Sequence, residues 1–256
     1  MLPVVRLMTS ISKSMASELG LGDKLRAGIN LSNFLLVSGV DSEGLPVGVA
    51  PDMAKAIGQS WGCDVELVPF TSPGLLADAA SEDVWDIGLI AAEPARAEVI
   101  SFSAAYVEIE ATYMVQQGLN LKNIDEVDQN GIKIGVAGRS AYDLYLTRTL
   151  KKASLVRGEG LAGAVELFSE AKVDVLAGLR PGLIADEARL QGNILTGRFT
   201  TVQQAVGNRR GNELLSKELA SFVESAKTSG LVERLIKKYG MEGKLLVAGP
   251  SSATGR

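Results

Sequence analysis

The 256-residue sequence contains no histidine and only one cysteine, Cys63. Histidine is the commonest metal ligand and the usual general base of serine and cysteine hydrolases, so its absence argues against both kinds of site. One cysteine cannot form an intramolecular disulfide or a thiolate cluster. We interpret Cys63 as a packing residue rather than a reactive thiol, because no adjacent cation is evident to lower its pKa. We expect no metal and no cofactor.

Aromatic residues are also scarce, at 5% of the chain, so recognition by stacked rings has few side chains to use. Lysine and arginine total 26 against 30 acidic residues, and a net charge of -4 argues against a nucleic-acid partner. No stretch approaches the ~18 continuous apolar residues of a membrane span. The segment 1–24 never sustains the apolar run of about 7 to 15 residues of a secretory signal, so a native start at Met1 predicts a cytoplasmic protein.

Short apolar strands alternate with amphipathic helices along the chain, which predicts an α/β fold with a mostly parallel sheet. We expect strands over 25–31, 65–70, 86–91, 132–137, 154–157 and 173–177, and helices over 52–61, 73–80, 141–152 and 162–171. The same order of elements occurs twice, which indicates two similar lobes. Two last helices, over 213–229 and 231–239, carry an apolar stripe that can cover the first lobe if the chain crosses back.

Seven short stretches, in this order, carry a resemblance to a known family. They are 25–30 (LRAGIN), 48–53 (GVAPDM), 85–89 (WDIGL), 94–106 (PARAEVISFSAAY), 138–140 (GRS), 172–175 (KVDV) and 205–212 (AVGNRRGN). Over about residues 25–244 the chain resembles the type II periplasmic binding proteins, specifically solute-binding protein family 3, the polar amino-acid receptors. The stretch 94–106 is the most specific, because it is similar to the family's Pro-Glu-Arg-Ala segment leading to Phe-Ser-x-x-Tyr.

The resemblance implies a two-lobed periplasmic-binding-protein type II fold with two crossover hinge strands, near 110–116 and 203–207. Lobe 1 would comprise 1–112 plus 205–256 and lobe 2 would comprise 113–204, with the ligand cleft between them. Family members close on a solute by hinge bending and deliver it to an ABC transporter in the periplasm. The implied partners are a small-molecule carboxylate ligand and the transporter's membrane subunits, and we expect a monomer.

Two other functions stay open on the same fold. One is a cytosolic metabolite sensor or scavenger. The other is a dehydratase-like enzyme, for which Glu93, Glu108 and Glu110 are candidate acids by position only.

Arg96 matches the family arginine that binds the ligand carboxylate with both guanidinium donors. The alternative from spacing alone is a surface arginine paired with Glu93 or Glu98. Glu93 itself is either such a partner or a contact for a ligand hydroxyl or ammonium. The loop before Arg96 resembles a shortened form of the family loop, which leaves open whether the backbone amides near Ala91 face the ligand.

Ser140 matches the hydroxyl residue of the family's second-lobe motif, where free amides and a helix start favour an anion, although capping alone would also explain it. Arg139 stands where many relatives have glycine and points either to the cleft or to solvent. Asn30, Asn33 and Phe34 follow the first strand, in the loop that covers the ligand's side chain in the family. Phe34 serves equally well as core or as a cleft wall.

A family aspartate that holds the ligand's α-ammonium falls, by position, on Leu179, which is followed by Arg180. An unpaired ammonium costs on the order of several kcal/mol to desolvate, so a standard α-amino acid is disfavoured unless another acid replaces this group. If Arg180 reaches the cleft, it forms with Arg96 and Arg139 a cationic pocket suited to a dicarboxylate or an oxo acid. Of Gln203 and Gln204, strand alternation lets only one face the cleft.

Overall fold

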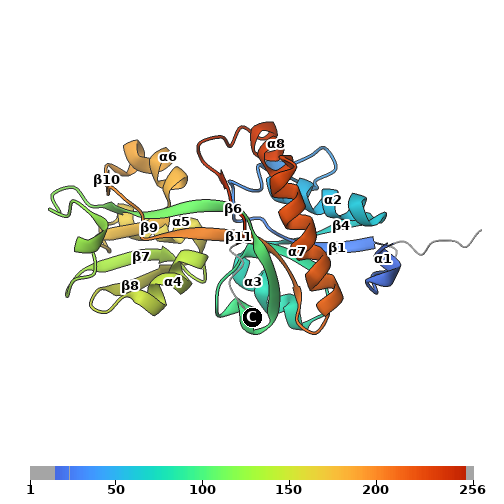
Figure 1. Cartoon of the computed structure of the whole chain (residues 1–256). Coiled ribbons are helices and arrows are strands. Elements are labelled where there is room, and N and C mark those ends of the chain that lie inside the picture. The colour runs from blue at the N-terminus through green and yellow to red at the C-terminus, as the bar shows by residue number, and fades with distance from the viewer. Residues whose placement is uncertain (1–14, 23, 252–256) are drawn as a thin grey trace, which may run out of the picture.

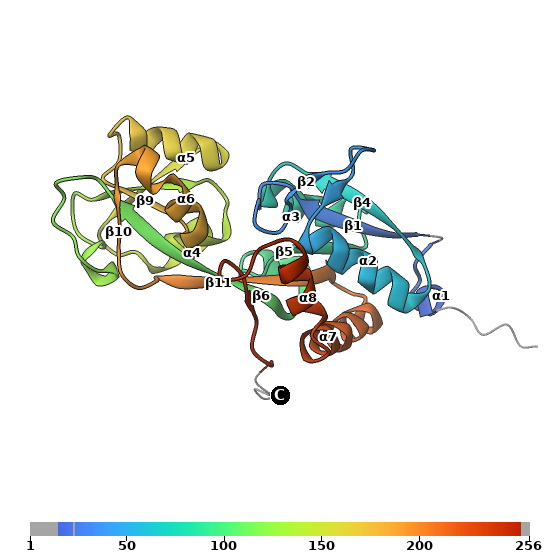
Figure 2. The ribbon, with the colours of Figure 1, turned by 90° about the horizontal axis from the view of Figure 1, so that it is seen from above.

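Two long strands, β6 (Ile100–Val115) and β11 (Thr200–Arg209), run antiparallel to each other through both halves of the molecule (Figure 1). The computed structural model describes residues 15–22 and 24–251, so our expectations for the first residues and for 252–256 lie outside the described residues. The main sheet has the strand order β4-β1-β5-β11-β6-β9-β7-β8. The two long strands at its centre therefore connect two lobes, which Figure 2 shows from above.

Lobe 1 is built on β1 (Lys24–Asn30), which pairs in parallel with β4 (Asp64–Phe70) and with β5 (Ile87–Ala91). The helix α2 (Val49–Trp61) follows β1 along the chain and buries apolar residues spaced one helical turn apart, Met53, Ile57 and Trp61. The helix α3 (Pro73–Asp78) begins where Ser72 caps it: the Leu75 amide donates to Ser72 Oγ over 3.2 Å.

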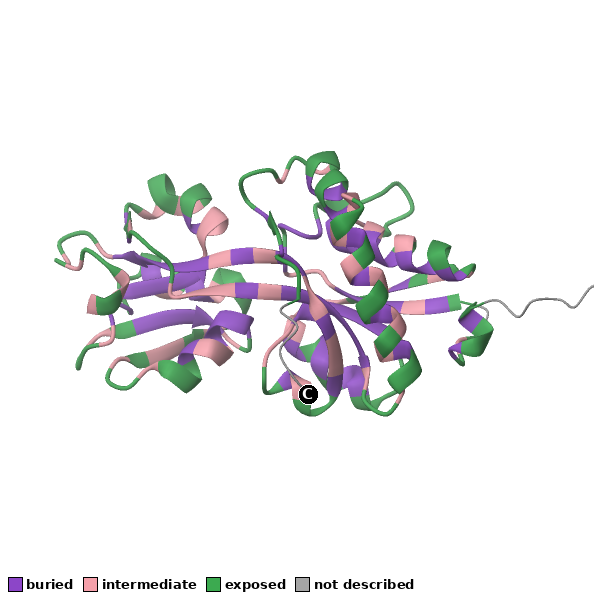
Figure 3. Cartoon of the chain, viewed as in Figure 1, coloured by how far each residue is buried: buried purple, intermediate pink, exposed green. Residues whose placement is uncertain are grey.

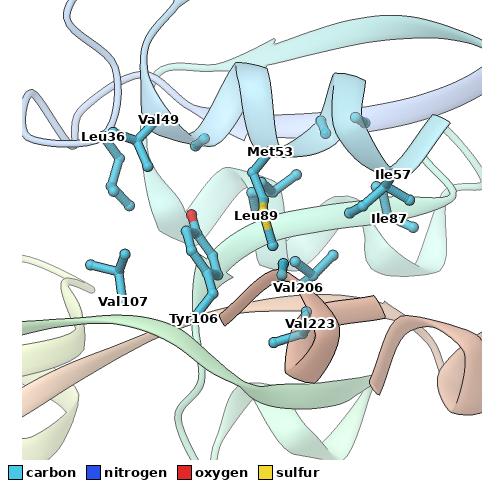
Figure 4. Packing of buried hydrophobic residues seen from close by; sticks show 14 of the residues in the cluster. Leu36, Val49, Met53, Ile57, Ile87, Leu89, Tyr106, Val107, Val206 and Val223 are labelled. Carbon is cyan, nitrogen blue, oxygen red and sulfur yellow. The ribbon is translucent and has the colours of Figure 1, made fainter. Parts of the chain in front are cut away.

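The last two helices, α7 (Glu213–Thr228) and α8 (Leu231–Lys238), return to lobe 1 as the apolar stripe predicts. Leu219 and Val223 of α7 are fully buried and share a core with Met53 and Leu89, as Figure 4 shows for Val223 and its neighbours. This packing joins two segments that are more than a hundred residues apart in the sequence, so the first lobe is discontinuous.

Lobe 2 repeats the arrangement with β7 (Lys133–Ala137), β8 (Ser154–Gly158) and β9 (Val175–Leu179), where β7 pairs in parallel with both others. Its helices are α4 (Ala141–Thr149), α5 (Gly160–Ser169) and α6 (Arg180–Leu190). Lobe 2 has its own buried core, and in both lobes the buried residues concentrate on the sheet (Figure 3). Leu179, at the end of β9, packs against the cores of both lobes.

The structure adds elements that the sequence pattern did not predict. The largest is α6, which begins at Arg180 and Pro181; Leu183 is the one residue of this helix that is buried. β6 begins ten residues before the predicted crossover strand, because 100–109 pairs with β11 inside lobe 1. Short elements complete the fold: α1 (Met15–Glu18), β2 (Gly39–Val40), β3 (Pro46–Val47), β10 (Asn193–Ile194) and β12 (Leu246–Val247).

Within each lobe the three outer strands are parallel, and the crossover strands are antiparallel to their neighbours. The result is a mixed α/β fold. None of the helices in the described ranges 15–22 and 24–251 combines the length and the apolar character needed to cross a membrane. The limits 1–112 plus 205–256 and 113–204 stay our prediction for the two lobes.

Candidate functional site: an interlobe cleft

A cavity of about 510 Å³ lies between the lobes, where the carboxyl ends of parallel strands from both sides meet. Asn30 ends β1, Ala91 ends β5 and Ala137 ends β7, and all three line it. Two other hollows, of about 580 and 640 Å³, are more open to solvent, and neither lies at these strand ends. Because ligands of α/β sheets bind beyond the carboxyl ends of the strands, we take the interlobe cavity, called the cleft below, as the candidate site.

Arg96 is the principal charged group of the cleft and is only 4% exposed. Its Nη1 donates to the carbonyl of Ala91 over 2.8 Å, and its Nη2 donates across the cleft to the carbonyl of Arg139 over 3.0 Å. Burial lowers the pKa of Arg96 to about 10; the charge of Glu93 opposes that shift and the charge of Arg139 adds to it. Among residues 15–22 and 24–251, no carboxylate forms an ion pair with this guanidinium.

The loop before α4 positions the carbonyl that Arg96 contacts. Arg139 has a φ of 61°, in the left-handed region that residues other than glycine rarely adopt. Asp143, which is buried, holds this turn by accepting the Arg139 amide at Oδ2 over 2.7 Å, and it also accepts from Arg157. Ser140 caps α4, since its Oγ accepts from the Asp143 amide over 3.1 Å.

The expectation of free backbone amides in this loop is wrong for all three of its residues. The Gly138 amide donates to the carbonyl of Gly158, the Arg139 amide donates to Asp143, and the Ser140 amide donates to the carbonyl of Ala137. The loop therefore presents the Ser140 side chain to the cleft, and its amides are used to hold the turn.

The side chain of Arg139 lines the cleft but is already paired. Its Nη1 and Nη2 donate to the two carboxylate oxygens of Asp78, over 2.9 and 2.6 Å, and Nη2 also donates to the carbonyl of Gly74. The Arg139 guanidinium holds the pKa of Asp78 below its usual range, and Asp78 raises that of Arg139. This ion pair joins the two lobes at the cleft and leaves Arg139 without a free charge for a second ligand anion.

Asn30 and Asn33 both line the cleft, as expected. Their carbonyl oxygens hold the local turn: Asn30 Oδ1 accepts from the Ser32 hydroxyl over 2.8 Å, and Asn33 Oδ1 accepts from the Leu35 amide. Gln204 also lines the cleft and is 4% exposed, whereas the Gln203 amide donates to Thr201 instead. One glutamine of the pair therefore faces inward, as strand alternation requires.

Other predicted residues lie elsewhere. Glu93 is held by Arg148 at 2.6 Å and does not line the cleft. Arg180 donates to Glu110 over 2.8 Å and to the carbonyl of Gly197, in a hollow separate from the cleft. The idea of a pocket with three free arginines is therefore wrong, because the first turn of α6 directs Arg180 toward the acid on β6.

Ala91 lines the cleft, whereas Phe34 lies beside it. Phe34 is 43% exposed and walls a smaller cavity beside the cleft. Ala91 lines the cleft with its carbonyl engaged by Arg96, and the amide of Ala92 continues the ladder by donating to the carbonyl of Gln203. The backbone amide next to Ala91 is thus used within the sheet.

Several residues of the cleft were not predicted from the sequence: Thr71, Ser72, Tyr142, Glu159 and Leu161. The signal that could have found them is their position just after the predicted strands 65–70 and 154–157 or at the start of the helix after 132–137. Glu159 is the one carboxylate among the described residues that line the cleft, and it is exposed. Tyr142 is buried, and burial raises the pKa of its hydroxyl to about 12.

The family model for bacterial extracellular solute-binding proteins, family 3, matches residues 26–242 of the chain. The amino-acid-binding protein AabA of Dichelobacter nodosus is 19% identical over 216 residues, which cover 82% of this chain and 85% of that protein.

Solved structures share the fold. One is an ancestral amino-acid-binding protein described as a precursor of cyclohexadienyl dehydratase, with a TM-score of 0.69, 23% identity, and coverage of 88% of this chain and 99% of that chain. Another is a putative binding component of an ABC transporter from Wolinella succinogenes, complexed with lysine, with a TM-score of 0.71, 20% identity, and coverage of 85% and 96%. The match to the family model spans most of the chain, so this protein belongs to the bacterial extracellular solute-binding proteins, family 3.

Proposed function

We propose that this protein binds a small carboxylate-bearing solute in the cleft and is the substrate-binding component of an ABC-type importer. The observation that carries the proposal is Arg96: a guanidinium that is 4% exposed, lines the cleft, and contacts backbone carbonyls without a carboxylate partner in the described chain.

Burial of a charged group without its counter-charge is costly, and a bound carboxylate offsets that cost. Arg96 uses one donor on each terminal nitrogen for a carbonyl, and a guanidinium has five donors in one plane. The remaining donors match the two oxygens of a carboxylate, which is the geometry that makes arginine–carboxylate pairs strong and specific. The carbonyl of Arg139 comes from lobe 2, so closure of the lobes and the orientation of Arg96 are coupled.

The relatives support a carboxylate. AabA is named as an amino-acid-binding protein, and the Wolinella succinogenes protein is complexed with lysine. An ancestral relative is bound to arginine in one structure and to glutamine in another. Each of these ligands carries an α-carboxylate and an α-ammonium, and only their side chains differ. In this chain the position expected for an ammonium-binding acid is Leu179, and Glu159 is the remaining acid at the cleft.

The dehydratase alternative has little support at the site. Glu93 and Glu110 are held by arginines, and Glu108 is likewise outside the set of described residues that line the cleft. An acid catalyst must reach the bond that breaks, so these three carboxylates are poor candidates. The family's description as extracellular supports a role outside the cytoplasm rather than as a cytosolic sensor.

Matched pairs of solutes test the proposal. Thermal unfolding is measured with butanoate and butanamide, glutarate and glutaramide, lysine and lysinamide, and arginine and argininamide. A ligand at 100 times its dissociation constant adds about 2.7 kcal/mol to the free energy of unfolding, which is an easily measured shift in Tm. We expect shifts only with the carboxylates. Equal shifts with a carboxylate and its amide would contradict the proposal.

A further inference from the structure

We propose that the solute carries a single carboxylate next to an apolar group, and that this group enters a side cavity of the cleft, here called the annex. This rests on the proposed function and names the chemical class of its ligand. The annex has a volume of about 270 Å³, and its principal walls are Phe34, Tyr142, Leu161, Leu179, Gly182 and Leu183.

The charge balance of the cleft favours one carboxylate. Arg96 and Arg139 are the two arginines among its described lining residues, and Arg139 is neutralised by both oxygens of Asp78. Arg180, the third cation of the predicted pocket, is paired with Glu110 away from the cleft. A second ligand carboxylate would therefore lose hydration and meet no free cation, and it would also approach Glu159.

The annex adjoins the cleft. Tyr142, Leu161 and Leu179 line both cavities, so the two lie side by side and a group attached to a carboxylate at Arg96 lies next to the annex. Its walls come from both lobes, because Phe34 follows β1 while Leu161 and Leu179 belong to lobe 2. A ligand group in the annex would thus contact both lobes and favour their closed arrangement.

The chemistry of the annex is apolar. Phe34 and Leu161 are 43% and 37% exposed, large values for side chains of this kind. Asp186, the one charged residue among the described residues that line the annex, is already paired with Arg189 at 2.6 Å. A polar group would find few partners there, whereas an alkyl or aryl group would cover the exposed faces of Phe34 and Leu161.

The Phe34 ring also packs closely against Gly182 of α6. A Cβ placed on Gly182 would lie 3.0 Å from Cζ of the Phe34 ring, so the ring rests against the first turn of α6. Leu179 stands at the junction of the two cavities and presents an alkyl surface there.

The experiment measures dissociation constants by calorimetry for butanoate, hexanoate, octanoate, 3-phenylpropanoate, glutarate, lysine and arginine. We expect each added methylene to tighten binding about threefold to fourfold until the annex is filled. We also expect 3-phenylpropanoate to bind more tightly than glutarate, lysine and arginine. A flat alkyl series, or tighter binding of glutarate, lysine or arginine, would overturn the inference.

Variants locate the apolar group. Phe34→Gln and Leu161→Gln replace exposed side chains, so both should fold, and each should weaken octanoate about tenfold. Phe34 lines the annex and not the cleft, so Phe34→Gln should change butanoate less than about twofold. Ile184→Gln is the matched control, because Ile184 is also exposed but lines the hollow around Arg180 and not the annex. An equal loss in all three variants, or in none, would contradict the annex.

The two proposals fail in different ways. If no carboxylate binds, or if Arg96→Met leaves carboxylate binding unchanged, the proposed function itself is wrong. If carboxylates bind through Arg96 and the annex variants have no effect, only the inference about the apolar group is wrong. Tight lysine binding that Glu159→Gln abolishes would replace it with a cationic amino acid held by Glu159.

Discussion

Arg96 and Arg139 lie on opposite sides of one cleft, and both side chains are cations. They differ in their partners, because Arg96 contacts carbonyls and Arg139 contacts a carboxylate. Arg96 is buried and contacts two carbonyls, and burial lowers its pKa to about 10. Arg139 is half exposed, contacts Asp78, and has its pKa raised by that carboxylate. The charge of Arg96 is therefore available to a ligand anion, whereas the charge of Arg139 is already balanced by Asp78.

The contrast shows that a cation at a cleft is not by itself an anion site. What matters is whether the protein already supplies the counter-charge and how much water the group retains. Arg96 is poorly solvated and contacts carbonyls, and Arg139 forms an ion pair that joins the two lobes. Changes at Arg96 and at Asp78 test the two sides of this comparison, and Arg180 is a paired cation away from the cleft.

The largest effect is expected for Arg96→Met. The methionine keeps an apolar stem of similar reach and removes the charge, so carboxylate binding should weaken at least about 100-fold, as for other buried charged contacts. The free energy of unfolding should stay the same or rise, because a buried unpaired charge is lost. Calorimetry and chemical denaturation measure the two quantities. Retained binding would show that Arg96 is not the carboxylate partner.

The pH dependence of binding tests the state of Arg96 without a mutation. A carboxylate needs the charged guanidinium, and with a pKa of about 10 in the free protein the charged fraction falls as the pH rises past that value. Affinity should be constant from about pH 7 to 9 and should be about fourfold weaker at about pH 10.5. A dissociation constant that stays flat to pH 10.5 would contradict the lowered pKa. The free energy of unfolding of Arg96→Met over the same pH range supplies the baseline for alkaline effects on the fold.

Asp78→Asn should remove the carboxylate partner of Arg139 and so make its charge available to a ligand, like that of Arg96. Removing the carboxylate frees a cation at the cleft, so the affinity for glutarate relative to butanoate should rise about twofold to fivefold, the range for exposed charge pairs. The ratio is measured because the loss of the lobe-to-lobe contact affects both ligands alike. The double variant Asp78→Asn with Arg139→Ala should restore the original ratio. If the ratio does not change in Asp78→Asn, Arg139 does not reach the ligand.

The smallest effect is expected for Arg180→Ala. Arg180 pairs with Glu110, which keeps a second partner in Arg198, and neither arginine lines the cleft. Ligand affinity should change less than about twofold, and the free energy of unfolding should fall by about 1 kcal/mol or less. A large loss of binding would show that Arg180 contributes to ligand binding.

The strand–helix order of both lobes could be predicted because apolar periodicity and caps such as Ser72 are local signals. The helix α6 was missed because Leu183 is its one buried residue, so the helix carries no apolar stripe. The length of β6 was underestimated because its first ten residues owe their extended form to pairing with β11, a strand about a hundred residues later.

The sequence alone determined the fold class, the missing histidine chemistry and the candidate Arg96, since these depend on residue types and short-range order. Only the tertiary structure decided which cations are free. The fates of Arg139 and Arg180 depend on Asp78 and Glu110, each more than 60 positions away. Pairing between distant side chains follows from how the two lobes meet, and no local pattern of residues records that contact.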